Sequence, residues 1–300
     1  MSTPDTVSFI EALARGLVFP QRTPILRRPD DVGLAYEDVF FPAIDGVTLE
    51  GWFIPADSDR LVICNHFGPA NRQGYPGHLE GFPASNGVSV DFLPKYKALH
   101  DAGYNVLAYD LRNHGMSASW GGGISGSGIY EWRDVLGSLR YARARPDTAG
   151  MQIHLHSLCM GCNGTFIAMQ RQPEAFAGVA SLIAIQPLVG ATLIRNACAM
   201  VGIPDGVAQL DPVLQRLGSQ RVSDHDVRPF AEAVCVPTLV LQVRQDMNSS
   251  EADVQEIFDR IPVADKDIHW IEDTPIRHHG YTYFSEHPER MVAWYDAHSR

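Results

Sequence analysis

Runs of apolar residues alternate with amphipathic segments along most of the chain. Continuous apolar runs of strand length, typical of strands buried on both faces, occupy residues 61–67, 104–110, 151–157, 178–186, 237–243 and 267–272. Helical periodicity is found near residues 91–102, 129–145, 160–171, 251–260 and 287–299. Strands that alternate with helices at this spacing form a parallel sheet covered on both faces. The pattern therefore predicts an α/β fold with a mostly parallel central sheet.

Two segments depart from this rhythm. Residues 36–54 alternate apolar and polar positions around Asp45 and Gly46, a pair typical of tight turns, and so predict an N-terminal β-hairpin at one edge of the sheet. Residues 187–235 separate two strands and carry helical periodicity, which favours a small helical cap over an ordinary crossover with a long loop. The predicted organisation is an N-terminal helical segment at 1–35, a core made of 36–186 and 236–300, and a cap at 187–235.

Composition narrows the class of protein. The 300 residues are 45% hydrophobic and 20% charged, so a sizeable core can form and disorder of the whole chain is excluded. A net charge of −11 argues against nucleic acid or an anionic membrane as the main partner. No apolar run reaches the roughly 18–20 residues of a membrane span, and Glu11 and Arg15 make the N-terminus a poor signal peptide. The odd number of cysteines, five, favours reduced thiols, and we expect a cytoplasmic protein.

The strand predicted at 151–157 runs directly into the letters SLCMG (157–161) and then into a helix. A nucleophile on a strained strand-to-helix turn requires small residues two positions before and two positions after it. Ser157 and Gly161 meet this requirement around Cys159, and a helix N-terminus favours a thiolate there. A rival register makes Ser157 the nucleophile, but it puts the large Leu155 at a position that should be small.

This turn resembles the nucleophile elbow of α/β-hydrolases, with cysteine in the central position as in the dienelactone-hydrolase branch. The letters DLRNHGMS (110–117) are similar to the D-x-R-G-x-G-x-S loop of that family, with Asn113 in place of a glycine. The resemblance covers about residues 36–298. It implies the α/β-hydrolase fold and a catalytic triad in the chain order nucleophile, acid, histidine.

The resemblance also implies the other triad residues. Asp246 follows the strand at 237–243, where the family carries its acid, and the carboxyl edge of an α/β sheet is where ligands bind. His279 begins a His-Gly-aromatic sequence similar to that of dienelactone hydrolases, and its neighbour His278 is the alternative. The implied reaction is acyl transfer, in which Cys159 attacks a carbonyl and His279, oriented by Asp246, moves the proton.

Two backbone N–H groups are expected to form the oxyanion hole. One belongs to Met160, the residue after the nucleophile, and the other to Phe67, in the loop after the strand at 61–67. The sequence at this loop is His66-Phe67-Gly68, where the family usually has His-Gly.

The expected substrate is a small acyl compound, an ester, lactone or thioester, with no cofactor, metal, nucleic acid or membrane partner, in a monomer or homodimer. Hydrolysis is the first expectation, and transfer or cyclisation through the same acyl-enzyme is the alternative. Cys159 and Cys162 also form a Cys-x-x-Cys, which leaves a redox pair open; a structural zinc site is less favoured because no second such motif exists. A non-catalytic ligand-binding protein of the same fold is the hypothesis from another class.

Overall fold

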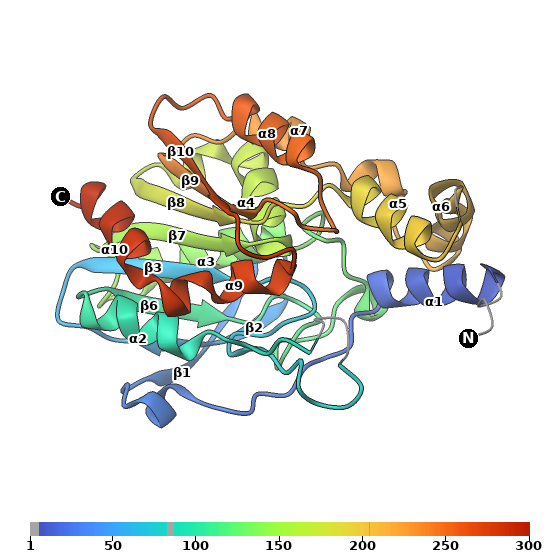
Figure 1. The fold of residues 1–300 in the computed structure, drawn as a ribbon. Helices are drawn as coiled ribbons and strands as arrows, with labels where there is room; N and C mark the ends of the chain where they lie inside the picture. The colour runs from blue at the N-terminus through green and yellow to red at the C-terminus, as the bar shows by residue number, and fades with distance from the viewer. Residues whose placement is uncertain (1–5, 83–86, 204) are drawn as a thin grey trace.

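The computed structural model describes residues 6–82, 87–203 and 205–300. The remaining positions, 1–5, 83–86 and 204, lie outside the described residues and include the start of the predicted N-terminal segment. Within the described part, the chain forms one large central sheet with helices on both of its faces (Figure 1).

The central sheet has eight strands in the order β1-β2-β6-β3-β7-β8-β9-β10. They are β1 (Glu37–Pro42), β2 (Thr48–Ile54), β3 (Arg60–Asn65), β6 (Asn105–Tyr109), β7 (Gln152–Leu158), β8 (Val179–Ile185), β9 (Thr238–Val243) and β10 (Lys266–Ile271). The β1–β2 and β2–β6 pairs are antiparallel, and every later pair is parallel. The predicted α/β class with a mostly parallel sheet is therefore confirmed. A small second sheet pairs β4 (Gly74–Tyr75) with β5 (Val90–Asp91).

Helices cover the two faces of the sheet as separate layers. One layer contains α2 (Leu93–Asp101), α9 (Arg277–Glu286) and α10 (Pro288–Ala297), and the other contains α3 (Trp132–Ala144), α4 (Met160–Arg171), α7 (Arg228–Ala231) and α8 (Glu251–Arg260). Short 3-10 turns lie at Pro29–Val32, Gly121–Gly123, Pro173–Phe176 and Val222–His225. Buried Leu99 and Tyr295 belong to the first layer, and buried Phe166 and Ile257 to the second, so each layer packs its apolar stripe against one sheet face.

Helix α9 is the main difference from the predicted elements. The sequence pattern predicts no helix between the last strand and the last helix, where His279 lies, but the chain is helical from Arg277 to Glu286. A helix fixes which of its side chains share a face, and this decides which residues reach the sheet edge.

Three helices form a third layer at one end of the molecule. Helices α5 (Gly190–Met200) and α6 (Gly206–Arg216) arise from the segment predicted as a cap, and α1 (Thr6–Val18) packs beside them (Figure 1). Buried Ile10 and Ala14 of α1 join Ile194, Cys198 and Leu210 in one apolar cluster. The N-terminal helix therefore packs with the cap helices, although the chain separates them by more than 170 residues. None of the described helices has both the length and the apolar character that crossing a membrane requires.

Two helical glycines provide a stability test of the packing between α3 and the β1–β2 turn. A Cβ on Gly137 of α3 would lie 2.6 Å from the Cα of Ala43 and 2.8 Å from the carbonyl oxygen of Pro42, whereas a Cβ on Gly16 of α1 meets nothing within 4 Å. Gly137→Ala should lower the free energy of unfolding by about 1–3 kcal/mol, because backbone atoms must move. Gly16→Ala should raise it by up to about 1 kcal/mol through helix propensity. Urea denaturation of both variants measures the two effects, and a Gly137→Ala protein as stable as Gly16→Ala would show that α3 does not pack this closely.

Candidate active site

Cys159 lies on a sharp turn between β7 and α4. Its backbone dihedrals are φ 47° and ψ −106°, a strained conformation for a non-glycine residue. Its N–H donates to the carbonyl oxygen of Ile185 at 2.8 Å, which ties the turn to the end of β8. A Cβ on Gly161 would lie 2.5 Å from the carbonyl oxygen of Asn65, so this position requires glycine. The turn has the geometry that a nucleophile elbow needs.

Ser157, the rival nucleophile, lies inside the sheet rather than at its edge. Its side chain is fully buried, and its Oγ accepts from Asn65 Nδ2 at 2.9 Å and is 2.9 Å from the Thr165 hydroxyl. This hydroxyl takes part in an internal hydrogen-bond network. Cys162 is also fully buried, in the apolar core on the α4 side of the sheet.

The guanidinium of Arg277, at the start of α9, lies beside both Asp246 and Cys159. Arg277 Nη1 forms an ion pair with Asp246, and Nε donates to Tyr281 Oη at 2.7 Å. Arg277 Nη2 donates to the carbonyl oxygen of Gln186 at 2.5 Å. The Arg277 guanidinium and the Tyr281 hydroxyl both lie close enough to the Cys159 side chain to interact with it electrostatically. The structure thus brings the predicted nucleophile and the predicted acid together around an arginine.

Electrostatics keep both Arg277 and Tyr281 protonated. Burial alone would lower the pKa of Arg277, but Tyr281, Asp246 and Cys159 raise it well above its usual range. Burial raises the pKa of Tyr281 well above its ordinary value, so its hydroxyl keeps its proton. A cation and a neutral hydroxyl therefore lie near the Cys159 side chain.

His279 is not part of this group of side chains. Its Nδ1 is 2.7 Å from the Thr274 hydroxyl, and among the described residues no hydrogen bond joins it to Asp246 or Cys159. The reason is helical geometry: Arg277 and Tyr281 are four residues apart and share one face of α9, whereas a residue two positions from Arg277 points about 200° away from it. The sequence pattern does not single out Arg277 and Tyr281, because it predicts no helix in this segment. The signal that could have found them is the i, i+4 spacing of a cation and a tyrosine.

His278, the alternative histidine, packs among aromatic rings. Its ring centroid lies 5.8 Å from that of Phe67, 5.9 Å from that of Tyr75 and 5.6 Å from that of Tyr281. Burial, followed by the neighbouring Arg277 charge, lowers the pKa of His278 to about 4. A neutral imidazole in this setting acts as part of the aromatic wall behind Arg277.

The two predicted oxyanion donors are free of backbone partners. Within the described part of the chain, neither the Met160 N–H nor the Phe67 N–H makes a hydrogen bond. The Phe67 ring stacks on Tyr281 with centroids 3.9 Å apart and an interplanar angle of 10°, which fixes the loop after β3 against α9. A buried N–H without a partner is available to an oxygen that a ligand brings.

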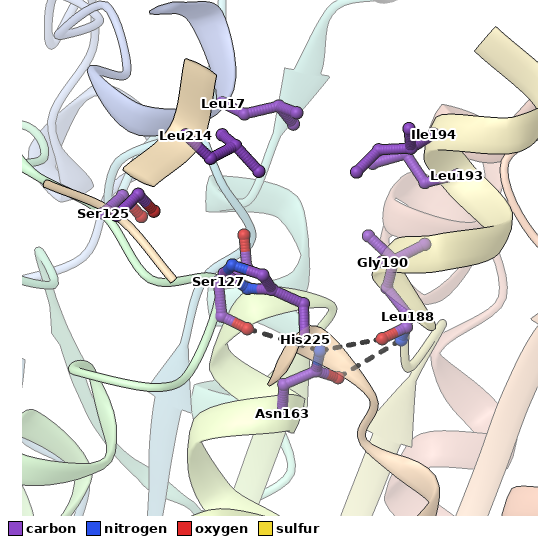
Figure 2. Close-up of a pocket in the computed structure, with 11 residues that line it drawn as sticks. Leu17, Ser125, Ser127, Asn163, Leu188, Gly190, Leu193, Ile194, Leu214 and His225 are labelled. Atoms are coloured by element: carbon purple, nitrogen blue, oxygen red, sulfur yellow. Dashed lines mark hydrogen bonds between the residues drawn. The ribbon is translucent and has the colours of Figure 1, made fainter. Parts of the chain in front are cut away.

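A cavity of about 370 Å³ opens beside Cys159. It reaches from Cys159, Met160 and His114 to apolar residues of α1 and of the segment that leads into α5. A smaller pocket of about 30 Å³ adjoins it and shares several of its lining residues: Leu17, Ser125, Ser127, Asn163, Leu188 and Leu193. Figure 2 shows this smaller pocket, with Asn163 at its base bonded to the backbone of Ser127 and Leu188. The described residues include no group of three or more potential metal ligands.

Comparison with solved structures identifies the fold. A scan against protein-family models and a search of curated proteins give no match. An esterase from Pyrococcus furiosus is 20% identical over 94% of this chain and 98% of its own, with a TM-score of 0.69. An α/β hydrolase from a Penicillium species is 18% identical over 88% and 99%, with a TM-score of 0.61. A dienelactone hydrolase from Anabaena variabilis is 12% identical over 88% and 99%, with a TM-score of 0.54. The chain therefore has the α/β-hydrolase fold.

The Arg277–Asp246 ion pair generates a stability prediction. Asp246 is 5% exposed, so Arg277→Met leaves a buried carboxylate without its cation, and the free energy of unfolding should fall by about 3–5 kcal/mol. Adding Asp246→Asn should restore part of this loss, because the uncompensated charge disappears. Urea denaturation of the two single variants and the double variant measures the coupling. The control is Arg244→Met, which removes an exposed ion pair with Glu272 and should change stability little. Equal losses for the two arginine variants would contradict a structural role for the buried pair.

Proposed function

We propose that this protein is an acyl-transfer enzyme that forms a thioester on Cys159, with an ester, lactone or thioester as substrate. The observation that carries the proposal is the strained turn of Cys159 beside a cavity and two unpartnered N–H groups. A strained non-glycine conformation persists only where the surrounding structure enforces it, and such residues cluster at functional sites. The solved neighbours described as esterase and dienelactone hydrolase support the same chemical class.

The reaction has two half-reactions. The Cys159 sulfur attacks the substrate carbonyl carbon, and the oxygen of the tetrahedral intermediate accepts hydrogen bonds from the Met160 and Phe67 N–H groups. Collapse breaks the bond to the leaving group, which departs with the proton that the Cys159 thiol lost on attack, and leaves an acyl thioester. Water or another nucleophile then attacks the thioester carbonyl and gives up a proton to the departing sulfur, which releases the acyl product and restores the thiol. Hydrolysis is the first outcome, and transfer or cyclisation uses the same intermediate.

In this proposal Arg277 takes the position that the sequence assigned to an imidazole. Its guanidinium and the Tyr281 hydroxyl lie near the sulfur and supply hydrogen-bond donors to it during the attack, while Asp246 holds the guanidinium in place. The Cys-His-Asp triad built on His279 is the competing form of the same proposal. It requires His279 to leave Thr274 and turn toward Asp246.

A non-catalytic ligand-binding protein is the second candidate function. The observation that favours it is the arginine between acid and thiol, since a permanently charged guanidinium does not shuttle protons as an imidazole does. This candidate shares the cavity and the fold with the enzyme, and it differs in giving no turnover.

Thiol labelling tests the activated cysteine. At pH 6–7, iodoacetamide should modify Cys159 at least about tenfold faster than Cys235, an exposed free thiol that serves as internal control. Arg277→Met should slow the Cys159 reaction, because a cation beside the sulfur is lost. Peptide mass mapping after timed quenching identifies the labelled residue. If Cys235 reacts first in the wild-type protein, Cys159 is not an activated nucleophile. A Cys159–Cys162 disulfide in non-reducing mass analysis would favour the redox alternative.

Turnover by single variants assigns the nucleophile. On p-nitrophenyl ester and thioester panels, Cys159→Ala should lower kcat by at least about 1,000-fold, as expected when a covalent nucleophile is removed. Ser157→Ala should retain activity within about tenfold, because its hydroxyl serves the internal network. His279→Ala distinguishes the two forms of the proposal: retained activity supports the arginine form, and a loss equal to that of Cys159→Ala supports the triad. A wild-type protein inactive on both panels would favour the binding protein.

A further inference from the structure

His114 lines the same cavity as Cys159 and carries a buried acceptor atom without a hydrogen-bond partner. It lies in the loop after β6, within the letters DLRNHGMS, and only 1% of the residue is exposed. Its Nδ1 is 2.8 Å from the carbonyl oxygen of Arg112, so Nδ1 bears the proton and donates. Its Nε2 is buried and has no hydrogen-bond partner.

The neighbouring His66 shows what a structural histidine looks like here. The two ring centroids are 5.4 Å apart, and both ring nitrogens of His66 have partners: Nδ1 is 2.8 Å from the Phe67 carbonyl oxygen, and Nε2 accepts from the Leu111 N–H at 2.9 Å. His66 therefore holds its loop with its whole hydrogen-bonding capacity. His114 uses only one of its two nitrogens.

The loop that carries His114 is held rigidly. Buried Asp110 pairs with Arg72 at 2.7 Å, and Arg22 Nη1 donates to the carbonyl oxygens of Gly115 at 2.6 Å and Ser117 at 2.8 Å. With the backbone fixed on both sides and Nδ1 bonded to Arg112, the direction of Nε2 is fixed as well.

The unpartnered nitrogen lies close to the nucleophile elbow. A Cβ on Gly68 would lie 3.6 Å from His114 Nε2 and 3.3 Å from Met160 Sδ, so only a glycine separates them. His114, Met160 and Cys159 all line the 370 Å³ cavity. Burial lowers the pKa of His114, so the ring is neutral and Nε2 presents a lone pair.

We propose that His114 Nε2 accepts a hydrogen bond from a hydroxyl or amide N–H on the acyl compound that Cys159 attacks. The rest of the wall is mostly apolar, with Leu13, Leu17, Leu188 and Leu193 among its residues. The substrate class is therefore an apolar acyl chain with one donor near its carbonyl. A buried acceptor without a partner disfavours an analogue that lacks the donor. The inference rests on the proposed function and names its substrate.

The test compares matched thioesters. Hexanoyl N-acetylcysteamine and its 2-hydroxy and 3-hydroxy derivatives differ only in the donor. We expect at least one hydroxyacyl form to have a kcat/KM roughly 10- to 100-fold above that of the hexanoyl form. Equal values of kcat/KM for all three, in an active wild-type enzyme, would overturn the inference and leave the proposed function standing.

Variants assign the discrimination to His114. His114→Phe keeps a planar ring but lacks the acceptor, and it should bring the ratio of the two kcat/KM values close to one. His100→Phe, a histidine on α2 that does not line the cavity, should keep the wild-type ratio. A ratio that survives in His114→Phe would overturn the inference. Circular dichroism checks that each variant is folded. If His114→Phe does not fold, the ratio of the two kcat/KM values in the wild-type protein still tests the inference.

Binding separates failure of the inference from failure of the proposed function. The Cys159→Ala variant is titrated by calorimetry with hexanamide and with its 2-hydroxy and 3-hydroxy derivatives. The titration measures binding when no reaction can follow. At least one hydroxyamide should bind about tenfold more tightly than hexanamide. If the protein shows this preference but has no turnover, the His114 site is retained and the proposed enzymatic function is rejected. Equal affinities, or no binding of any amide, would overturn the inference.

Discussion

The site depends on one buried guanidinium that joins segments distant in the sequence. Arg277 donates to Asp246 after β9, to the Gln186 carbonyl oxygen after β8 and to Tyr281 on its own helix, and its charge lies near Cys159 at the end of β7. The carboxyl ends of three adjacent parallel strands therefore meet at one cation. A buried ion pair is weak evidence for stability by itself. Here it fixes geometry, because each partner holds the guanidinium from a different direction and leaves it few alternative positions.

Two residues with strained backbone lie at the same sheet edge. Cys159 and Gln186 are non-glycine residues with positive φ, 47° and 51°, and each such conformation costs about 1–3 kcal/mol. Hydrogen bonds to the next strand hold both of them, from Cys159 N–H to Ile185 and from Gln186 N–H to Leu241, each at 2.8 Å. Connecting these strands to the segments that follow them does not by itself require two strained residues near Arg277. The two turns place the Cys159 thiol at the surface of the cavity.

The sequence predicted the strands and the elbow because their signals are local. Apolar runs of strand length reveal buried strands, and the small residues at Ser157 and Gly161 reveal the turn at Cys159. The partner of Asp246 was not predictable in the same way. The letters RHHGYTYFSE (277–286) combine histidines, aromatic residues and Gly280, which are poor helix formers, so no helix was expected. Tertiary packing overrides this propensity: a Cβ on Gly280 would lie 2.4 Å from Gln186 Nε2, so close contact with the sheet edge explains the glycine.

The far wall of the cavity also depends on contacts that the sequence does not reveal. Ala12, Leu13 and Leu17 of α1 line the same cavity as Cys159, because α1 packs against α5 and α6. An acyl chain bound at the thiol would lie against these side chains and gain affinity by burying apolar surface. Such a wall selects for apolar length but not for a functional group. Selectivity for a functional group must come from the polar atoms of the lining, and Asn163 has already used its amide on the backbone of Leu188. His114 Nε2 has no hydrogen-bond partner, and it is therefore the polar atom that remains to select a functional group of the substrate.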